Sequence, residues 1–477
     1  MDPVALFLLS IAGIFLIGAI GEIIFQRTNI PDVIWLIFAG ILLGPVFGLL
    51  TKDRLNAIAP YFAALTLVVV LFEGGSALKL SELSRAAPRS SLLAISTFFT
   101  AAVAMASFSM LAAWLGALPE EWSWSHGWLL GAILGGSSSI IIMPAMAQAR
   151  LPAELANLVN LESALTDAFC VVGTSAIIDV MLRGDTGSSG PAMTLLRSFG
   201  IGLAIGGVAG LIWILFLKVL HSNEHAYPVT LSALLILYVV IDKAGGSAAL
   251  GILTVAVILG NAPSLSRTIG LAHQVELDTS VRGFHRQMAF IIKSFFFVFI
   301  GAMLAPPWSL ILIGVVFGLV LFAARIPAVY LSLLGSGLAP DEKKIGAVAM
   351  PRGMAAGVLA TLPVSAGVPG TEGLPVVVFA CVLTTILVFA VGFPMIRGQM
   401  QLKAAEPQGQ IPLPAGAPRP FGETPLPAGA VTTGGGAAET GPDPAGATPP
   451  DYRVDVTAPI YVGGKEPGRG GDQGGGA

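Results

Sequence analysis

Long apolar runs separated by short polar stretches fill most of the chain up to about residue 400. The runs are continuous, and many reach the ~20 residues that a helix needs to cross a bilayer. Membrane strands would alternate apolar and polar residues instead, so the pattern excludes a barrel and predicts an all-α polytopic membrane protein. We expect thirteen transmembrane helices, over about residues 4–24, 31–50, 57–78, 91–115, 127–149, 155–182, 193–220, 227–242, 246–262, 286–304, 308–335, 345–366 and 373–396. The polar segment 263–285 is expected to be an interfacial helix that links two bundles.

The composition agrees with this pattern. The 477 residues are 55% apolar and 11% charged, whereas soluble domains are about 25% charged. The mean hydropathy is +0.82. The bulk of the chain therefore faces lipid, and the bilayer rather than nucleic acid is its expected environment.

The distribution of Lys and Arg predicts the orientation, because these residues are enriched in cytoplasmic loops. With the N-terminus outside, thirteen Lys and Arg residues fall on the cytoplasmic side, whereas the outer loops hold only Lys52, Arg54, Arg183, Arg197 and Lys243. The first apolar run, 4–24, lacks the charged start and cleavage site of a signal peptide and is expected to be retained. The prediction is a bacterial-type inner-membrane protein with its C-terminus in the cytoplasm.

The composition changes at about residue 401, from which Pro, Gly, Ala and Thr dominate. Such a segment cannot bury enough apolar surface to offset the entropy of ordering it. We therefore expect a transmembrane domain over 1–400 and a disordered Pro/Gly/Ala-rich cytoplasmic tail over 401–477.

Ionisable residues inside predicted spans mark candidate function, because a charge in the membrane is costly. Four stand out, namely Glu73, Glu162, Asp167 and Arg325. Two further basic residues, Lys293 and Arg352, lie nearer to predicted helix ends, where snorkelling to the interface would explain them.

Glu162 and Asp167 are five residues apart, so they project about 140° apart around a helix and face different neighbours. One can pair with a buried cation such as Arg325, which stays charged. The other can hold either a proton or a cation, but not both at once, and this competition is the chemistry that an exchanger requires. In the alternative interpretation, both acids only tie helices together.

Two predicted spans contain residues that interrupt helices. One carries Gly135-Gly-Ser-Ser-Ser-Ile-Ile-Ile-Met-Pro144, and the other carries Pro351-Arg-Gly-Met-Ala-Ala-Gly357. Interrupted helices in the two halves of a transporter often form its binding site, where unwound carbonyls ligate the ion. Small residues also serve close helix packing, but the position of Asp167 between the two spans favours an ion site.

Several motifs together resemble those of the monovalent cation:proton antiporter superfamily, close to its NhaP-type sodium/proton antiporters. They cover about residues 5–397: Ile30 to Pro45, Leu71-Phe-Glu-Gly-Gly75, Arg150-Leu-Pro152, Glu162-Ser-Ala-Leu-Thr-Asp167, Gly245 to Asn261, Arg325-Ile-Pro327 and Arg352-Gly353.

The resemblance implies a fold of thirteen helices with inverted repeats and two crossed discontinuous helices. A core domain would move against a scaffold domain that forms a homodimer. The protein would be a secondary transporter rather than an enzyme, without a cofactor, and would exchange a monovalent cation, sodium by preference, for protons. Glu162 and Arg325 would form a core ion pair, with Arg352 as a second arginine motif. The expected ion and proton ligands are Asp167, Thr166, Ser163, Ser137, Ser138 and Glu73.

Two departures from the family pattern bear on ion selectivity. Thr166 stands where the family has Asn, and Ser137-Ser-Ser139 replaces its Thr-Asp-Pro. The second departure is similar to the Kef-type potassium efflux branch and removes a carboxylate. One titratable acid favours one proton per cation, although Glu73 could add a second proton.

Two other functions are considered. A Kef-like potassium/proton efflux system is the alternative, but no Gly-x-Gly-x-x-Gly unit follows a strand in the tail. An intramembrane hydrolase would pair Asp167 with Asp179 or Asp242. Asp179 is about 18 Å along the same helix, too far to share a proton, and Asp242 is at a span end.

Overall fold

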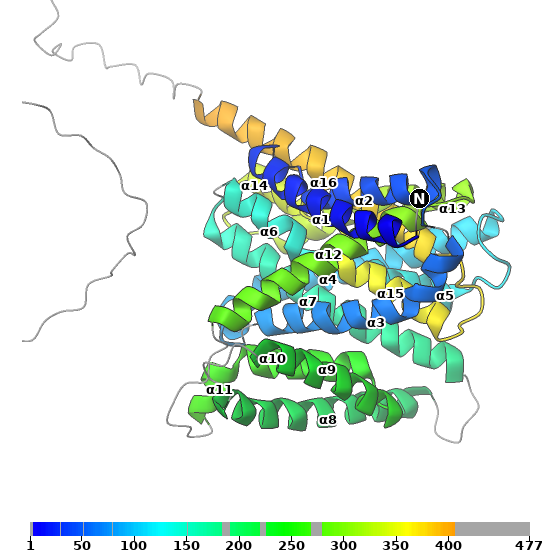
Figure 1. The fold of residues 1–477 in the computed structure, drawn as a ribbon. Coiled ribbons are helices and arrows are strands. Elements are labelled where there is room, and N and C mark those ends of the chain that lie inside the picture. Colours follow the sequence, from blue (N-terminus) through cyan, green and yellow to red (C-terminus); the bar gives the residue numbers. More distant parts are fainter. Residues whose placement is uncertain are drawn as a thin grey trace, which may run out of the picture. The chain divides into compact units, whose positions relative to one another are not determined.

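The computed structural model of the chain describes residues 3–28, 30–50, 52–78, 80–149, 151–183, 191–219, 226–268 and 279–405. Every regular element in these ranges is a helix (Figure 1). The predicted all-α class is therefore confirmed. The predicted tail lies outside the described residues except for its first five positions, which continue the last helix to Ala405.

The helices follow the predicted apolar runs closely. The first half contains α1 (Pro3–Thr28), α2 (Asp32–Ile41), the π-helical η1 (Leu42–Val46), α3 (Lys52–Ala77), α4 (Leu80–Trp114), α5 (Trp124–Leu134), α6 (Ser139–Gln148) and α7 (Ala153–Arg183). The second half contains α8 (Pro191–Val219), α9 (Ala226–Lys243), α10 (Ala248–Gly260), α11 (Ala262–Thr268), α12 (Thr279–Met303), α13 (Trp308–Ser332), α14 (Pro340–Val348), α15 (Met354–Ser365) and α16 (Leu374–Ala405).

Length and composition show that this is a multi-span membrane protein. Seven helical stretches in the described part are long and apolar enough to cross a membrane, and five shorter apolar helices accompany them. The count of thirteen crossings stays a prediction. The segment 263–285, expected to be one interfacial helix, contains the short α11 and the start of α12, and its residues 269–278 lie outside the described part.

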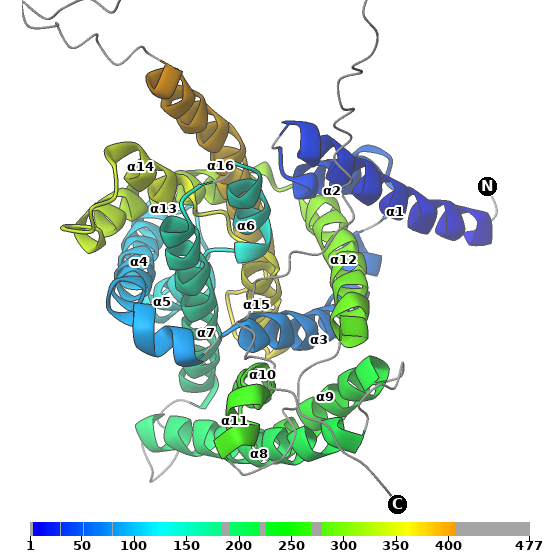
Figure 2. The ribbon, with the colours of Figure 1, turned by 90° about the vertical axis from the view of Figure 1, so that its left-hand side faces the viewer.

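The helices pack in two groups. In the first group, α4, α5, α7, α13 and α16 pack on one another, and α14 and α15 pack against α16. The second group contains α1, α2 and α12 on one side and α8, α9 and α10 on the other (Figure 2). Helix α3 lies between them, since it contacts both α15 and α10. The division into a core and a scaffold that the resemblance implies stays a prediction.

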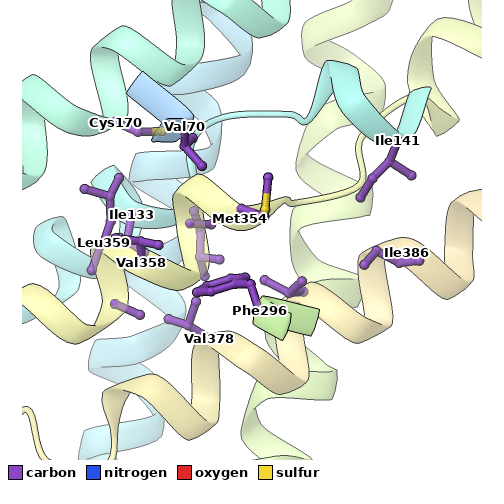
Figure 3. Packing of buried hydrophobic residues seen from close by; sticks show 14 of the residues in the cluster. Val70, Ile133, Ile141, Cys170, Phe296, Met354, Val358, Leu359, Val378 and Ile386 are labelled. Atoms are coloured by element: carbon purple, nitrogen blue, oxygen red, sulfur yellow. The ribbon is translucent and has the colours of Figure 1, made fainter. Parts of the chain in front are cut away.

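Small residues allow close contact inside each group, as is usual for membrane helices. Gly40 of α2 and Gly301 of α12 face each other, and a Cβ built on Gly301 would lie 3.0 Å from the Cα of Gly40. At the junction between the groups, the ring of Phe296 on α12 fills the space beside Gly357 of α15 (Figure 3).

His126 ties together two segments that are far apart in the sequence. It is buried and stacks on Trp122, with ring centroids 5.2 Å apart. Its Nδ1 accepts the backbone N–H of Ser123 (3.1 Å), and its Nε2 donates to the carbonyl of Pro369 (2.9 Å). The loop after α15 is thereby fastened to the start of α5.

The contact between α2 and α12 predicts that Gly301→Ala is destabilising. The added methyl group meets backbone on the facing helix, and overpacking of this kind costs about 1–3 kcal/mol. We expect a lower melting temperature of the detergent-solubilised protein. Gly13→Ala is the matched control, because a Cβ there meets nothing within 4 Å, and Ala is the better helix former by about 1 kcal/mol. Equal melting temperatures for the two variants would contradict this account of the packing.

Candidate functional site

Two helix interruptions meet inside the bundle. Residues 135–138 separate α5 from α6, and residues 349–353 separate α14 from α15. The N–H of Ser138 donates to the carbonyl of Pro351 at 2.8 Å, so the two unwound segments touch. A Cβ on Gly353 would lie only 2.6 Å from that of Ser138, so this approach requires glycine. Both interruptions predicted from the sequence are present.

Helix α7 supplies partners for the backbone groups that the first interruption exposes. The hydroxyl of Ser163 accepts the N–H of Ser139 and donates to the carbonyl of Ser137, both at 2.7 Å. The hydroxyl of Thr166 accepts the N–H of Ser137 at 3.3 Å and donates to the carbonyl of Ser163 at 3.0 Å. Two residues predicted as ion ligands thus hold the unwound backbone on α7.

Arg352 lies inside the protein rather than at a membrane interface. It is 2% exposed, and its guanidinium donates to the carbonyl of Gly136, just beyond the end of α5. Its own N–H donates to the hydroxyl of Thr385 at 3.0 Å. The snorkelling interpretation of Arg352 was wrong, because tertiary packing folds its side chain against the other interruption.

Asp167 lies one residue beyond Thr166 and faces the interruption. A Cβ on Gly136 would lie 3.3 Å from one carboxylate oxygen of Asp167, and a Cβ on Gly74 of α3 would lie 3.9 Å from the other. No hydrogen bond or ion pair to the residues that the structure describes holds this carboxylate. It is therefore available to bind a proton or a cation.

A cavity of about 300 Å³ opens in front of Asp167. Its polar lining includes Glu73 of α3, Asn160 of α7, Ser138 and Ser139. Within the described part of the chain, Oε2 of Glu73 is buried and has no hydrogen-bond partner. Two carboxylates from different helices thus face one cavity, with amide and hydroxyl oxygens beside them.

Glu162 points elsewhere on α7. Arg325 donates to both of its carboxylate oxygens, at 2.6 and 2.8 Å, and the two side chains are 0% and 3% exposed. Thr97 donates to Glu162 at 3.1 Å, and Arg325 also donates to the carbonyl of Gly346 at 3.1 Å. The structure brings together the pair that the sequence suggested, with its charges neutralised and its hydrogen bonds made.

The predicted ligand set therefore divides by position. Asp167, Glu73 and Ser138 line the cavity, whereas Ser163 and Thr166 lie behind it. The hydroxyl of Ser137 is buried and has no partner among the described residues. Asn160 was missed by the sequence analysis, although it lies seven residues before Asp167, a spacing of about two helical turns that places both on one face.

A search of the described residues finds no group of three or more His, Cys, Asp or Glu side chains that could hold a metal ion. The two buried cysteines, Cys170 and Cys381, are not disulfide-bonded.

Comparison with known proteins agrees with this geometry. Residues 11–396 match the family described as sodium/hydrogen exchanger, transmembrane. The chain belongs to the sodium/hydrogen exchanger family. The resemblance seen in the sequence motifs is thereby confirmed.

Individual members of the family are similar over most of this chain. The K(+)/H(+) antiporter NhaP2 of Shewanella baltica is 30% identical over 402 residues, which is 80% of this chain and 65% of that protein. The Na(+)/H(+) antiporter 1 of Methanocaldococcus jannaschii is 26% identical over 370 residues, 74% of this chain and 81% of that one. This chain thus spans somewhat less than two thirds of the length of NhaP2.

The fold is also that of a solved structure. The sodium proton antiporter MjNhaP1 of Methanocaldococcus jannaschii superimposes with a TM-score of 0.65 at 22% identity, covering 83% of this chain and 99% of that one. These similarities are to NhaP-type proteins, so the Kef-like alternative raised by Ser137-Ser-Ser139 is not favoured.

The buried pair predicts a strong dependence of stability on Arg325. Arg325→Met leaves Glu162 buried without its cation, which costs about 3–5 kcal/mol. We expect a large drop in the melting temperature of the purified protein. The double variant Glu162→Leu/Arg325→Met should recover most of that loss, because removing both charges leaves no uncompensated ion. A double variant as unstable as the single one would show that the pair is not the cause.

Proposed function

We propose that the protein is a secondary antiporter that exchanges a monovalent cation for protons, with Asp167 as the shared binding group. The observation that carries this proposal is the unpaired Asp167 carboxylate, which faces a cavity beside two unwound helix segments. A carboxylate there can be neutralised by a proton or by a cation. An empty, charged site is the least stable state within the membrane.

The surroundings of Asp167 support cation binding. Cations of this class take oxygen ligands, and Glu73, Ser138 and Asn160 offer them around the cavity. Unwound backbone carbonyls add further candidates. We propose Asp167, Glu73 and Ser138 as direct ligands, with Thr166 and Ser163 acting through the backbone that they hold. Ser137 is proposed to contribute through its backbone as well, since its hydroxyl does not line the cavity.

Arg352 balances charge at the crossing, which is the place where the unwound segments 135–138 and 349–353 meet. The C-terminal end of α5 and the C-terminal end of α14 carry partial negative charge, while the starts of α6 and α15 carry partial positive charge. The guanidinium on the Gly136 carbonyl stabilises the end of α5. We propose that Arg352 keeps the crossing intact during transport and does not itself carry the ion.

The two helix groups suggest how access could alternate. Asp167 belongs to α7 in the first group, whereas Glu73 belongs to α3 between the groups. A movement of the first group against α3 would separate the two carboxylates and change which side of the membrane reaches Asp167. Neutralisation of Asp167 by either ligand would permit that movement.

An electroneutral cycle of one proton per cation follows if Asp167 alone exchanges a proton. A second proton is carried if Glu73, whose Oε2 has no hydrogen-bond partner among the described residues, exchanges one as well. Sodium and potassium are both candidates, since the names of the relatives include both. We propose that Thr166 influences the choice between sodium and potassium, because its hydroxyl sets the position of the unwound Ser137.

We further propose that the protein forms a homodimer through the scaffold. Its N-terminus would lie outside the cell and its C-terminus in the cytoplasm.

Asp167→Asn is expected to abolish cation-driven proton flux in proteoliposomes, because an amide neither carries a proton nor neutralises a cation. Sodium, potassium and lithium should be tested in turn, and the variant should be silent with each ion that the unmodified protein transports. Glu154→Gln is the matched control, since it makes the same change in the first turn of α7, where the side chain is exposed.

A folded Asp167→Asn variant with flux comparable to that of the control would overturn the proposed role. Melting temperature and gel-filtration profile show whether both variants are folded. Equal loss of flux in Asp167→Asn and Glu154→Gln would also contradict the role of Asp167. Such a result would mean that flux is sensitive to the loss of any acid on α7.

A further inference from the structure

A second, larger cavity leads to Glu73 from outside the Asp167 cavity. It measures about 560 Å³ and is lined by residues of α1, α3, α6, α12 and α15, among them Glu22, Gln287 and Lys293. The two cavities share Glu73, Ile140 and Met354. A cation that follows this route to Asp167 therefore passes the Glu73 carboxylate.

Lys293 forms an ion pair within this second cavity. Its Nζ lies 2.6 Å from Oδ2 of Asp32, and the two side chains are 13% and 12% exposed. The ammonium also lies over the ring of Phe290, 5.5 Å from the centroid. The snorkelling interpretation of Lys293 was therefore wrong, since the side chain is held within the protein by a carboxylate on α2.

The position of Asp32 is fixed by packing. It occupies the first turn of α2, and a Cβ on Gly21 of α1 would lie 3.3 Å from its Cβ. Asp32 therefore remains beside α12 as a partner for Lys293. It does not line either cavity in front of Glu73, so its effect on a passing cation is exerted through Lys293.

Lys293 and Glu73 line the same cavity, so the charge of the lysine acts on the carboxylate across it. Lys293 is thus bonded to one carboxylate, Asp32, and shares a cavity with a second, Glu73, whose Oε2 has no hydrogen-bond partner among the described residues. Charges at this depth interact more strongly than in water because the effective dielectric constant is lower. A lysine released from Asp32 would be attracted to Glu73, the same group that an incoming cation meets.

We infer that Lys293 is a tethered competitor for Glu73 and that Asp32, by holding the ammonium away, sets the apparent affinity for the transported cation. This inference rests on the proposed antiport function. Asp32 is a positioning residue in this scheme, because it acts on the ion path only through Lys293. Loss of the Asp32 charge would allow the ammonium to neutralise Glu73, and the lysine would then repel cations beside the residues that the two cavities share.

The test is cation-driven proton flux in proteoliposomes with Asp32→Asn, Lys293→Gln and the double variant. We expect Asp32→Asn to raise the apparent KM for the cation at least fivefold, with the maximal rate within twofold of the unmodified protein. The double variant is expected to return the KM to within twofold, because the competitor is gone. If Asp32 had only a structural role, removing Lys293 as well would not restore the KM.

The inference is overturned if Asp32→Asn leaves the KM unchanged, or if the double variant keeps the raised value. Lys293→Gln alone decides the question if Asp32→Asn does not fold. Its KM is expected to lie at or below that of the unmodified protein, and a several-fold rise would contradict competition. Absence of flux in the unmodified protein, or flux in Asp167→Asn, would defeat the antiport proposal itself and is distinguishable from these outcomes.

Discussion

An interrupted helix inside a membrane leaves backbone N–H and C=O groups that only the protein can satisfy, and this constraint organises the site. Each unsatisfied group would cost several kcal/mol in hydrocarbon. Here Ser163 and Thr166 bond the first interruption, Ser138 and Pro351 bond the two interruptions to each other, and Arg352 caps the end of α5. Ser163, Thr166 and Arg352 thus bond to backbone groups, whereas the carboxylates of Asp167 and Glu73 face the cavity.

The same requirement, that buried polar groups find partners within the protein, explains how the charges are distributed. Arg325 neutralises Glu162 through two short hydrogen bonds, so this acid is a fixed part of the core. Asp167, five residues later on α7, faces the cavity, and in the proposed antiport its charge is balanced by the bound proton or cation. A helix that carries one neutralised and one open carboxylate can keep its packing through a transport cycle while the charge of its binding site changes.

Sequence patterns predicted much of this arrangement. Apolar run lengths located the helices, Gly and Ser clusters located both interruptions, and helical periodicity separated the direction of Glu162 from that of Asp167. The partners of Lys293 and Arg352 could not be predicted, because nearness to a helix end is compatible with both snorkelling and burial, and only tertiary packing decides between them. The hydroxyls of Thr166 and Ser163 were predicted as ligands because their chemistry suits a cation, but the same oxygens also suit unpaired backbone.

The central claim is that one carboxylate holds either a proton or a cation. Calorimetric titration of the purified protein with the transported cation, in buffers of different ionisation enthalpy, measures proton release directly. We expect about one proton to be released per cation bound at a pH where Asp167 is protonated, and no such release from Asp167→Asn. Cation binding by the unmodified protein without proton release at any pH would contradict it.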